Sequence, residues 1–509
     1  MLDTLGVATD SNYARLRSPG RVQDFGVMLA LHPRTLRVVC ASENAGPITG
    51  IAHAEILGRA LGEVLEDDAG LAEIRAAAGA DYPTFENPVP VRLGGRKFDA
   101  VLHAHDGLIF AELEPVAPGA PGRAEMDRLN EEAIAGMMVP ETLDALIAAA
   151  PAAIRAATGF DRVMLYRFDE AFRGQVIAEA RAEGVDSFMG LFFPDSDIGP
   201  PARQLYEQNF SRYIPRVAGQ AFRLLPAENP LTGRPVDMSH ALLRAVAPCH
   251  VEYLENMGVA ASMSYSIVAD GKLWGLFACH HHQPAQLSYV QRLVCEQIAM
   301  LFVAKLENLL NPAAMAEEMA RRQAALLSQS PLCAPDPLSQ SWDATQEEAL
   351  LGLVEADGAA IYIGGRVGQI GQCPDLADLH AYITQQPEAF ARLIHMYDDN
   401  GLFYSNAIAT VLPFGEAMRA RGSGMLVIPL ARDSHAYLIW FRPELVVKAT
   451  WAGNPGARGS TTSTARPRKS FQAWKEDIRD RSAPWTNLQI ANAVAVRDHL
   501  LAQGRIGRG

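Results

Sequence analysis

The chain has 509 residues, of which 49% are hydrophobic and 20% are charged, and its net charge is −13. This length exceeds one ordinary hydrophobic core, and typical domain sizes predict about three domains. The acidic balance argues against a nucleic-acid or anionic-membrane partner, because both carry negative charge themselves.

Cysteine usage and hydropathy point to a reducing, aqueous compartment. The six cysteines form no Cys-x-x-Cys pair, which argues against a disulfide framework and against a zinc ribbon. The first twenty residues lack the apolar core of a signal peptide, and no run of about 18 residues is continuously apolar. We therefore expect a cytoplasmic protein with no membrane partner.

Residues 21–117 mix short β-like runs such as "FGVMLALH" with helical segments such as "AEILGRALGEVL". This composition predicts an α+β domain. Three prolines and two glycines within residues 115–122 mark a linker after it.

A second α+β unit follows, beginning with an apolar helical pattern over residues 143–159. Further along, the loop "FFPDSDIGPPARQLY" places Asp195 and Asp197 beside two phenylalanines. Carboxylates next to aromatic rings suit a cationic, planar ligand. Arg212 and Arg244 would suit a ligand with two carboxylates, although ordinary surface charge is the alternative.

The stretch "APCHVEYLENMG" places a cysteine before a histidine at the start of a predicted helix. Val251, Leu254 and Met257 recur at helical spacing, which puts Cys249 in the first turn. The helix N-terminus and the adjacent imidazole of His250 would both favour the nucleophilic thiolate. The alternative is a small buried cysteine in the core.

Asp270-Gly271 lies between two alternating runs and predicts a β-hairpin. The second run ends in "CHHH" at residues 279–282. A metal site is one interpretation, but consecutive strand residues point to opposite faces and converge poorly on one ion. Strand packing and ligand contact are the other two. Helical spacing then covers residues 287–310 and resumes after Asn311-Pro312 to about residue 327, as a rigid connector would.

The third unit, about residues 328–509, again has an α+β composition. Within it, residues 452–471 are rich in Gly, Ser, Thr and Arg and show no apolar periodicity until Phe471. Such a segment cannot bury a face by itself. It is either a disordered loop or a functional arm.

Three motifs together resemble the phytochrome family. "PDSDIGPPARQLY" (194–206) is similar to its Pro-Ala-Ser-Asp-Ile-Pro signature, residues 243–281 are similar to its chromophore-binding core, and "PRKSF" (467–471) resembles its tongue motif. The resemblance covers essentially the whole chain in the order PAS, GAF and PHY.

The resemblance implies an α+β fold with three domains, each a central antiparallel sheet flanked by helices and joined by long helices. The implied boundaries are residues 1–117 for the N-terminal segment and PAS domain, 118–311 for the GAF domain, and 312–509 for the PHY domain with a tongue at about 445–480. It also implies a knot, in which the N-terminal segment passes through an insert at about 215–240.

The resemblance further implies that the GAF domain binds a linear tetrapyrrole, or bilin. The backbone carbonyl of Asp197 would accept hydrogen bonds from the pyrrole N–H groups, while its side chain contacts Arg468 and Ser470 of the tongue. His250 would tune the protonation of the bilin, and His280 would meet the carbonyl of the isomerising ring. Such acceptors are needed because an unpaired buried cation is costly.

The other implied contacts hold the propionates and enclose the isomerising ring. Arg212 and Arg244 would bind propionates, and Ser262 and Ser264 would offer hydroxyls. The aromatic side chains around the ring would be Tyr166, Phe193, Tyr206 and Tyr253, and Ile198 is a further implied contact.

One departure from the bacterial pattern bears on attachment. Bacterial biliverdin-binding members use a cysteine near the N-terminus, and the corresponding position here is Ser11, a poor nucleophile without an activating base. Cys249-His250 instead matches the pair with which plant and cyanobacterial members form a thioether to phytochromobilin or phycocyanobilin. The competing interpretation is biliverdin bound without a covalent bond.

We therefore expect a red-light photoreceptor module that signals by Z/E isomerisation and tongue refolding, with autocatalytic attachment as its only chemistry. It would form a homodimer and act on an output domain beyond residue 509 or on a downstream signalling protein. A light-independent GAF-type ligand sensor is one rival. An enzyme is another, although no P-loop, catalytic triad or histidine-kinase motif is visible.

Overall fold

The computed structural model describes residues 14–80, 84–116, 123–169, 172–310, 331–334, 336–397, 401–430, 435–453 and 470–503. The chain divides into two compact units, which are described separately. Unit 1 comprises Met1–Leu309 and Thr450–Trp474, and unit 2 comprises Leu310–Ala449 and Lys475–Gly509. Both are mixed α+β structures built on mostly antiparallel sheets, as the sequence predicts.

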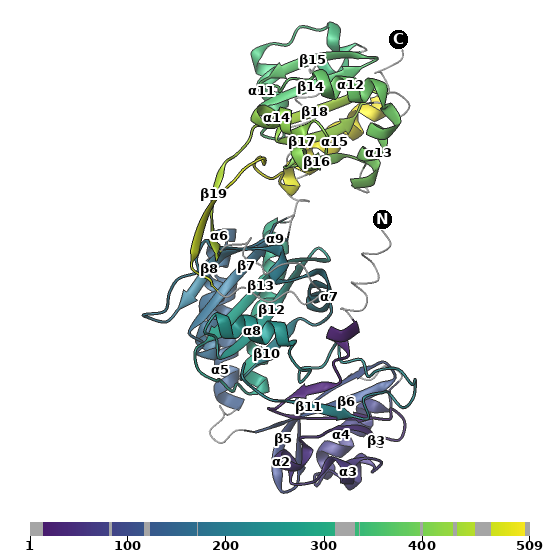
Figure 1. The fold of residues 1–509 in the computed structure, drawn as a ribbon, viewed down its shortest axis with the longest axis vertical. Helices are drawn as coiled ribbons and strands as arrows, with labels where there is room; N and C mark the ends of the chain where they lie inside the picture. The colour runs from purple at the N-terminus through teal and green to yellow at the C-terminus, as the bar shows by residue number, and fades with distance from the viewer. Residues whose placement is uncertain are drawn as a thin grey trace. The chain divides into compact units, whose positions relative to one another are not determined.

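The first sheet of unit 1 has seven strands in the order β1-β11-β3-β2-β6-β5-β4. The strands are β1 (Arg21–Gln23), β2 (Val27–Leu31), β3 (Val38–Ser42), β4 (Val89–Leu93), β5 (Arg96–His105), β6 (Leu108–Pro115) and β11 (Ala221–Leu225). The short helices α2 (Ala45–Thr49) and α3 (His53–Ile56) and the longer α4 (Asp68–Ala78) accompany it (Figure 1). Strand β11 comes from a distant part of the sequence, yet it pairs with both β1 and β3.

The N-terminal segment is bonded to the residues that follow β11. Arg17 forms an ion pair with Asp237, and Nη1 of Arg244 donates to the carbonyl of Leu16 over 2.8 Å. The expected knot depends on the path of residues 1–13, which lie outside the described residues, so it stays a prediction.

The second sheet has the order β10-β12-β13-β7-β8-β9-β19-β20. Its strands are β7 (Arg162–Phe168), β8 (Gly174–Arg181), β9 (Phe192–Phe193), β10 (Ser211–Ile214), β12 (Ala261–Ala269), β13 (Lys272–His281), β19 (Val447–Ala452) and β20 (Ala473–Ile478). The predicted hairpin is confirmed: Asp270 and Gly271 join β12 to β13 with φ of 49° and 69°, the left-handed conformation that a tight two-residue turn requires.

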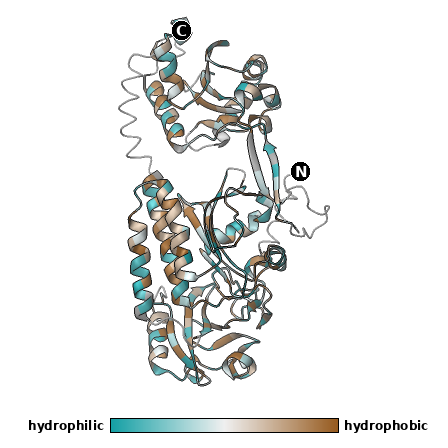
Figure 2. Cartoon of the chain, turned by 90° about the vertical axis from the view of Figure 1, so that its left-hand side faces the viewer, coloured by the Kyte–Doolittle hydropathy of each residue, from teal (hydrophilic) through white to brown (hydrophobic). Residues whose placement is uncertain are grey.

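Three long helices supply much of the core that covers one face of this sheet: α5 (Arg123–Met138), α6 (Leu143–Thr158) and α9 (Tyr289–Leu310). The predicted helix over residues 287–310 is thus confirmed, whereas its expected continuation to residue 327 lies outside the described residues. Figure 2 shows that hydrophobic and hydrophilic residues both occur along the long helices. This is the mixture expected of helices with one face in a core and one in solvent.

Strands β19 and β20 lie next to each other in the sheet order, and the N–H of Gly453 donates to the carbonyl of Gln472 over 2.9 Å. We call residues 447–453 and 470–478, which include these two strands, the arm. Residues 454–469, which connect them, lie outside the described residues. The arm joins the second sheet at Trp451, which pairs with Phe192 of β9.

Unit 2 contains a five-stranded sheet in the order β15-β14-β18-β17-β16. The strands are β14 (Gly358–Ile363), β15 (Arg366–Gly371), β16 (Phe403–Ser405), β17 (Gly424–Pro429) and β18 (Tyr437–Arg442). Its helices are α11 (Ala344–Gly352), α12 (Ala377–Gln385), α13 (Pro387–Tyr397), α14 (Gly415–Gly422) and α15 (Asn487–Gln503). Alternate residues of the central strands enter two separate apolar clusters, so both faces of the sheet are buried.

In the part of the chain that the structure describes, no helix is both long enough and apolar enough to span a bilayer.

We predict that Phe302→Ala destabilises unit 1 by about 3–5 kcal/mol, because it leaves a cavity in a closed core. Phe302 is fully buried and packs edge-on against Phe277, with ring centroids 5.1 Å apart. Urea unfolding followed by tryptophan fluorescence measures the change. The matched control on the same helix is Met300→Ala, because Met300 is 64% exposed. Equal unfolding midpoints for the two variants would contradict the prediction.

Candidate functional site

Cys249 is the second residue of helix α8 (Pro248–Asn256), and Pro248 occupies the first helical position. The helix starts here because proline fixes φ at a helical value and lacks the N–H that this position leaves unbonded. Cys249 is exposed, whereas Cys40, Cys279, Cys295 and Cys373 are buried and Cys333 is half-buried. The alternative of a small core cysteine is therefore wrong for Cys249.

The register of the second sheet collects four predicted residues on one face. Arg212 of β10 lies directly opposite Ser264 of β12, and Ser262 lies opposite His280 of β13. Directly opposed residues in antiparallel strands share a face, and so do residues two apart on one strand. Leu276 of β13 lies opposite Tyr166 of β7, so Tyr166 belongs to this face as well. We call it the polar face.

The opposite face is core. Met263, Tyr265 and Cys279 alternate with the polar-face residues and belong to the cluster that α6 and α9 complete. Burial raises the pKa of the Cys279 thiol well above its usual value. Cys279 is thus shielded from solvent and held as a neutral thiol, unlike Cys249.

The two predicted arginines are neighbours. Nη2 of Arg212 donates to the backbone carbonyl of Arg244. Burial, and then the nearby charge of Arg244, lower the pKa of Arg212 to about 9. Nη1 of Arg212 is buried and has no hydrogen-bond partner among the described residues. A buried cation with an unused donor fits a ligand carboxylate.

Tyr206 and the preceding loop adjoin the polar face. Tyr206, in helix α7 (Pro200–Gln208), shares a hydrogen bond with Ser264, and burial raises its pKa. Nε of Arg203 donates to the carbonyl of Ile198 over 2.7 Å, which fixes the loop.

Apolar packing joins this loop to the sheet. Phe193 lies 5.4 Å from Tyr166 between ring centroids, and Ile198 packs on the same small cluster. Tyr166, Phe193, Ile198 and Tyr206 are thus brought together as the resemblance implies.

Tyr253 links Asp197, His250 and the arm. Its hydroxyl donates to Oδ2 of Asp197 over 3.2 Å. Its ring stacks on His250 at 6.0 Å and meets Phe471 edge-on at 5.1 Å between centroids. Sequence analysis did not single out Phe471 as a site residue. The available signal was its place as the first apolar residue after the polar run of the arm.

The two predicted tongue contacts have different outcomes. Arg468 lies outside the described residues, so its expected pairing with Asp197 stays a prediction. Ser470 is exposed, and its Oγ accepts a hydrogen bond from the N–H of Gln472 within its own segment.

Both imidazoles of the site are neutral near pH 7. Burial, followed by the charge of Arg212, lowers the pKa of His250 to about 4. Burial, followed by the charge of Arg162, lowers the pKa of His280 to about 3. The expectation that the imidazole of His250 favours the Cys249 thiolate is not supported, because a ring whose pKa is about 4 supplies no positive charge at neutral pH.

The histidines that follow His280 are engaged elsewhere. Nδ1 of His281 and Nδ1 of His282 lie 2.9 and 2.8 Å from Oδ2 of Asp161. Across the described ranges, no group of three or more His, Cys, Asp or Glu side chains is placed to hold a metal ion.

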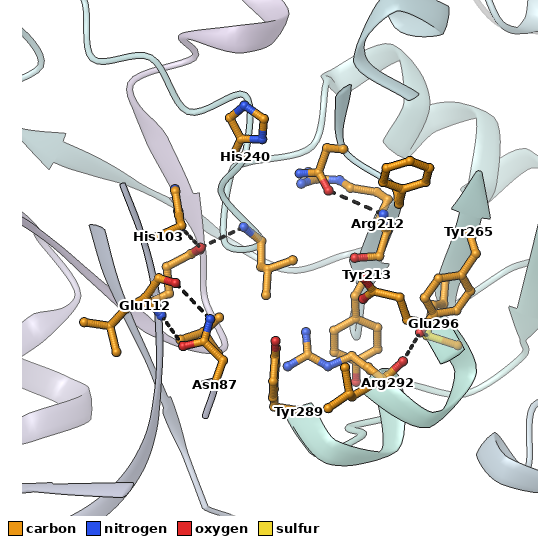
Figure 3. Close-up of a pocket in the computed structure, with 18 of the residues that line it drawn as sticks. Asn87, His103, Glu112, Arg212, Tyr213, His240, Tyr265, Tyr289, Arg292 and Glu296 are labelled. Carbon is orange, nitrogen blue, oxygen red and sulfur yellow. Dashed lines mark hydrogen bonds and ion pairs between the residues drawn. The ribbon is translucent and has the colours of Figure 1, made fainter. Parts of the chain in front are cut away.

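Unit 1 also contains a cavity of about 220 Å³ that sequence analysis did not predict. Figure 3 shows Asn87 with His103 and Glu112 of the first sheet on one side, and Arg212 and Arg292 on the other. Its lining includes neither Cys249 nor Asp197, so it is distinct from the predicted site apart from the shared Arg212.

Two buried carboxylates at or near this cavity connect the first sheet to residues 242–243 and to α9. Glu112 accepts hydrogen bonds from the N–H groups of Leu242 and Leu243, and burial raises its pKa to about 7. Glu114 forms a buried ion pair with Arg292 of α9.

Comparison with known proteins matches three family models to successive stretches of the chain. Residues 12–116 match the PAS fold, 142–305 the GAF domain and 340–504 the phytochrome region. Cyanobacterial phytochrome B from Nostoc sp. is 32% identical over 95% of this chain and 64% of its own length. A bacteriophytochrome from Xanthomonas campestris pv. campestris is 32% identical over 94% of this chain and 76% of its own length.

The crystal structure of a bacteriophytochrome from R. palustris superposes with a TM-score of 0.81 at 31% identity, covering 96% of this chain and 98% of that one. The chain spans 64% of the length of the cyanobacterial relatives that it matches.

We predict that His280→Gln weakens the acid sensitivity of the apoprotein. The folded-state pKa of His280 lies near 3, below its usual 6.5, so the unfolded chain binds the proton first. The stability due to the neutral imidazole is complete above pH 6.5 and is lost as the pH falls. Between pH 7 and pH 5 the wild type should lose about 2 kcal/mol more than the variant. Urea unfolding at both pH values tests this, and identical pH slopes would contradict it.

Proposed function

This chain belongs to the phytochrome family, and we propose that it is a red-light photoreceptor module that binds a linear tetrapyrrole on the polar face of the second sheet. The observation that carries the proposal is the convergence there of Arg212, Ser262, Ser264 and His280. His250, the neighbour of the exposed Cys249, lies close enough to Arg212 and His280 for their charges to interact. When bound, the bilin supplies red-light absorption and a double bond that isomerises between Z and E.

The propionate groups are assigned to the arginine end of this face. Arg212 has a buried donor that needs an acceptor, and Arg244 adds a second guanidinium within the same neighbourhood. The hydroxyls of Ser262, Ser264 and Tyr206 offer further hydrogen bonds. Two cations in a desolvated site attract carboxylates strongly and repel other cations, which favours one direction for the ligand.

Asp197 and His250 are assigned to the pyrrole nitrogens. The backbone carbonyl of Asp197 accepts from pyrrole N–H groups, while its side chain stays bonded to Tyr253. Because His250 is neutral, it can both donate and accept a hydrogen bond. A protonated ring system would therefore find acceptors rather than another charge.

The remaining residues are assigned to the ring that isomerises. His280 offers a neutral imidazole to its carbonyl, and Nδ1 of His280 is buried with no hydrogen-bond partner among the described residues. Tyr166 and Phe193 enclose this ring, with Tyr253 and Ile198 completing the wall. Tyr253 also contacts Phe471, so a change at the ring can reach the arm.

Cys249 is assigned as the attachment residue, with phycocyanobilin or phytochromobilin favoured and biliverdin as the alternative. Its exposure and its position in the first turn of α8 support this assignment. Attachment is the only chemistry proposed for the module.

The proposal extends to the organisation of the whole receptor. Domain boundaries are placed at residues 117 and 311, and the arm is assigned as the tongue, with Arg468 reaching Asp197. Signalling passes by refolding of the tongue to an output domain or downstream protein, from a cytoplasmic homodimer. The share of the cyanobacterial relatives that this chain leaves unmatched gives room for such an output domain.

We predict that protein produced with phycocyanobilin shows a visible band that red or orange light converts reversibly to a second form. Absorption spectra before and after illumination measure this. A colourless protein, or a coloured protein that light does not change, would contradict the photoreceptor function and favour a light-independent sensor.

We predict that phycocyanobilin stays with the denatured polypeptide and that Cys249→Ala abolishes this retention. A thioether survives denaturation, whereas a non-covalent complex does not. Zinc-induced fluorescence of the denatured band on a gel is the measurement. Cys279→Ala is the control, because Cys279 is fully buried and should leave the signal intact. Retention in Cys249→Ala would refute the assignment.

We predict that Phe471→Ala leaves attachment intact and changes the lifetime of one photostate by about fivefold or more. It removes the edge-on aromatic contact with Tyr253, which is worth about 1 kcal/mol beyond its buried area. The control is Trp474→Ala, because Trp474 is 46% exposed. Thermal recovery after illumination is the measurement, and equal lifetimes in both variants would show that the contact does not matter.

A further inference from the structure

Arg442 is the last residue of β18, at the point where the chain leaves unit 2 for the arm, and it is only 5% exposed. Its guanidinium donates to four backbone carbonyls on two other segments. Nη2 reaches Val354 over 2.7 Å and Nε reaches Glu355 over 3.2 Å. Nη1 reaches Ala483 over 3.2 Å and Pro484 over 2.8 Å, just after the chain returns from the arm.

The two limbs of the arm are joined immediately beyond Arg442. The N–H of Leu445 donates to the carbonyl of Arg481 over 2.6 Å, and the N–H of Asp480 donates to Oε1 of Glu444 over 2.7 Å. We call residues 444–445 and 480–481 the root of the arm. Any change in the pairing of the arm strands that reaches the root acts on residues close in sequence to Arg442 and to its partners Ala483 and Pro484.

The same guanidinium contacts the start of the C-terminal helix. Its central carbon lies 4.0 Å from the centre of the Trp485 ring, a cation–π contact, and Trp485 lies two positions before the first residue of α15. Nε1 of Trp485 donates to the carbonyl of Ser405 over 3.1 Å. Figure 1 shows α15 beside β17 and β16 of this sheet.

A second connection runs through the end of α11. Nε2 of Gln489 in α15 donates to Oε2 of Glu355 over 2.9 Å, and Nδ2 of Asn492 donates to the carbonyl of Leu353 over 2.7 Å. Residues 353–355 thus bind both Arg442 and α15. Displacing either limb of the arm must move, or break, contacts that also position the helix.

The arrangement is sensitive because the charge is buried and its direct partners are carbonyls. Burial lowers the pKa of Arg442, while the charges of Glu355 and Asp357 oppose that shift. Removing part of the carbonyl cage leaves a buried cation with unused donors, which is costly. We therefore expect Arg442 either to keep all four carbonyl partners or to exchange them together when the root of the arm changes.

We propose that Arg442 is a positioning residue that transmits a change in the arm to helix α15. This inference rests on the proposed photoreceptor function, and it identifies the residue through which the light signal leaves the sensor. The partners of Arg442 among the described residues all belong to unit 2, so we expect light absorption and bilin attachment not to depend on it directly.

The test is hydrogen–deuterium exchange of the holoprotein, with phycocyanobilin bound, in the dark and under red light. Wild type should show a light-dependent exchange difference in residues 473–484 and in α15. Arg442→Gln should photoconvert and keep the difference in 473–484, while the difference in α15 falls by about tenfold, as expected for losing a charge-assisted hydrogen bond. Arg366→Gln is the matched control, because the side chain of Arg366 is 59% exposed and pairs with Asp336.

Arg442→Lys guards against failure of the glutamine variant to fold. Lysine keeps the charge but lacks the planar guanidinium that bonds both other segments at once. Arg442→Lys should therefore also lose the light-dependent exchange difference in α15. An α15 difference that persists in the variant, even if exchange rises equally in both light states, would overturn the proposal and leave Arg442 a merely structural residue. Absence of the α15 difference in wild type would overturn it as well. Failure of the wild type to photoconvert would instead count against the proposed function.

Discussion

Side-chain alternation along β12 is the constraint on which the candidate site depends. Ser262 and Ser264 face the polar side, and Met263 and Tyr265 face the core. A slip of one residue would exchange the two sets and bury the serines among the helices. The tight Asp270-Gly271 turn and the hydrogen bond from Tyr265 to the carbonyl of Arg292, 2.7 Å long, oppose such a slip. Packing on one face therefore determines the chemistry of the other.

Electrostatics separates the site from the cavity that Figure 3 shows. On the polar face, cations are buried while the histidines stay neutral, so an anionic group is the missing complement. Around the cavity, the charge of Arg292 is already matched by Glu114. Arg212 lines both regions, so they differ in the second buried cation of the cavity, Arg292, which is already paired.

The elements that could be predicted from the sequence are those determined by residues close together in the chain. The hairpin at Asp270-Gly271, the helix start at Cys249 and the long helix over residues 289–310 each depend on neighbours in the sequence. The family motifs supplied the residues of the polar face. Contacts between distant segments were not accessible in this way, because a sequence pattern does not fix which strands pair. The approach of Phe471 to Tyr253 and the neutral state of His250 both depend on such tertiary burial.

Strand β11 has a consequence for how the protein can be divided. It belongs in sequence to the region matched by the GAF model, yet its backbone hydrogen bonds are made with β1 and β3 of the first sheet. A fragment that began at residue 142 would leave β11 with two open edges, a template for pairing with other chains and hence for aggregation. The stretches that match the PAS and GAF models therefore share one sheet, and a fragment that keeps this sheet intact has to retain both.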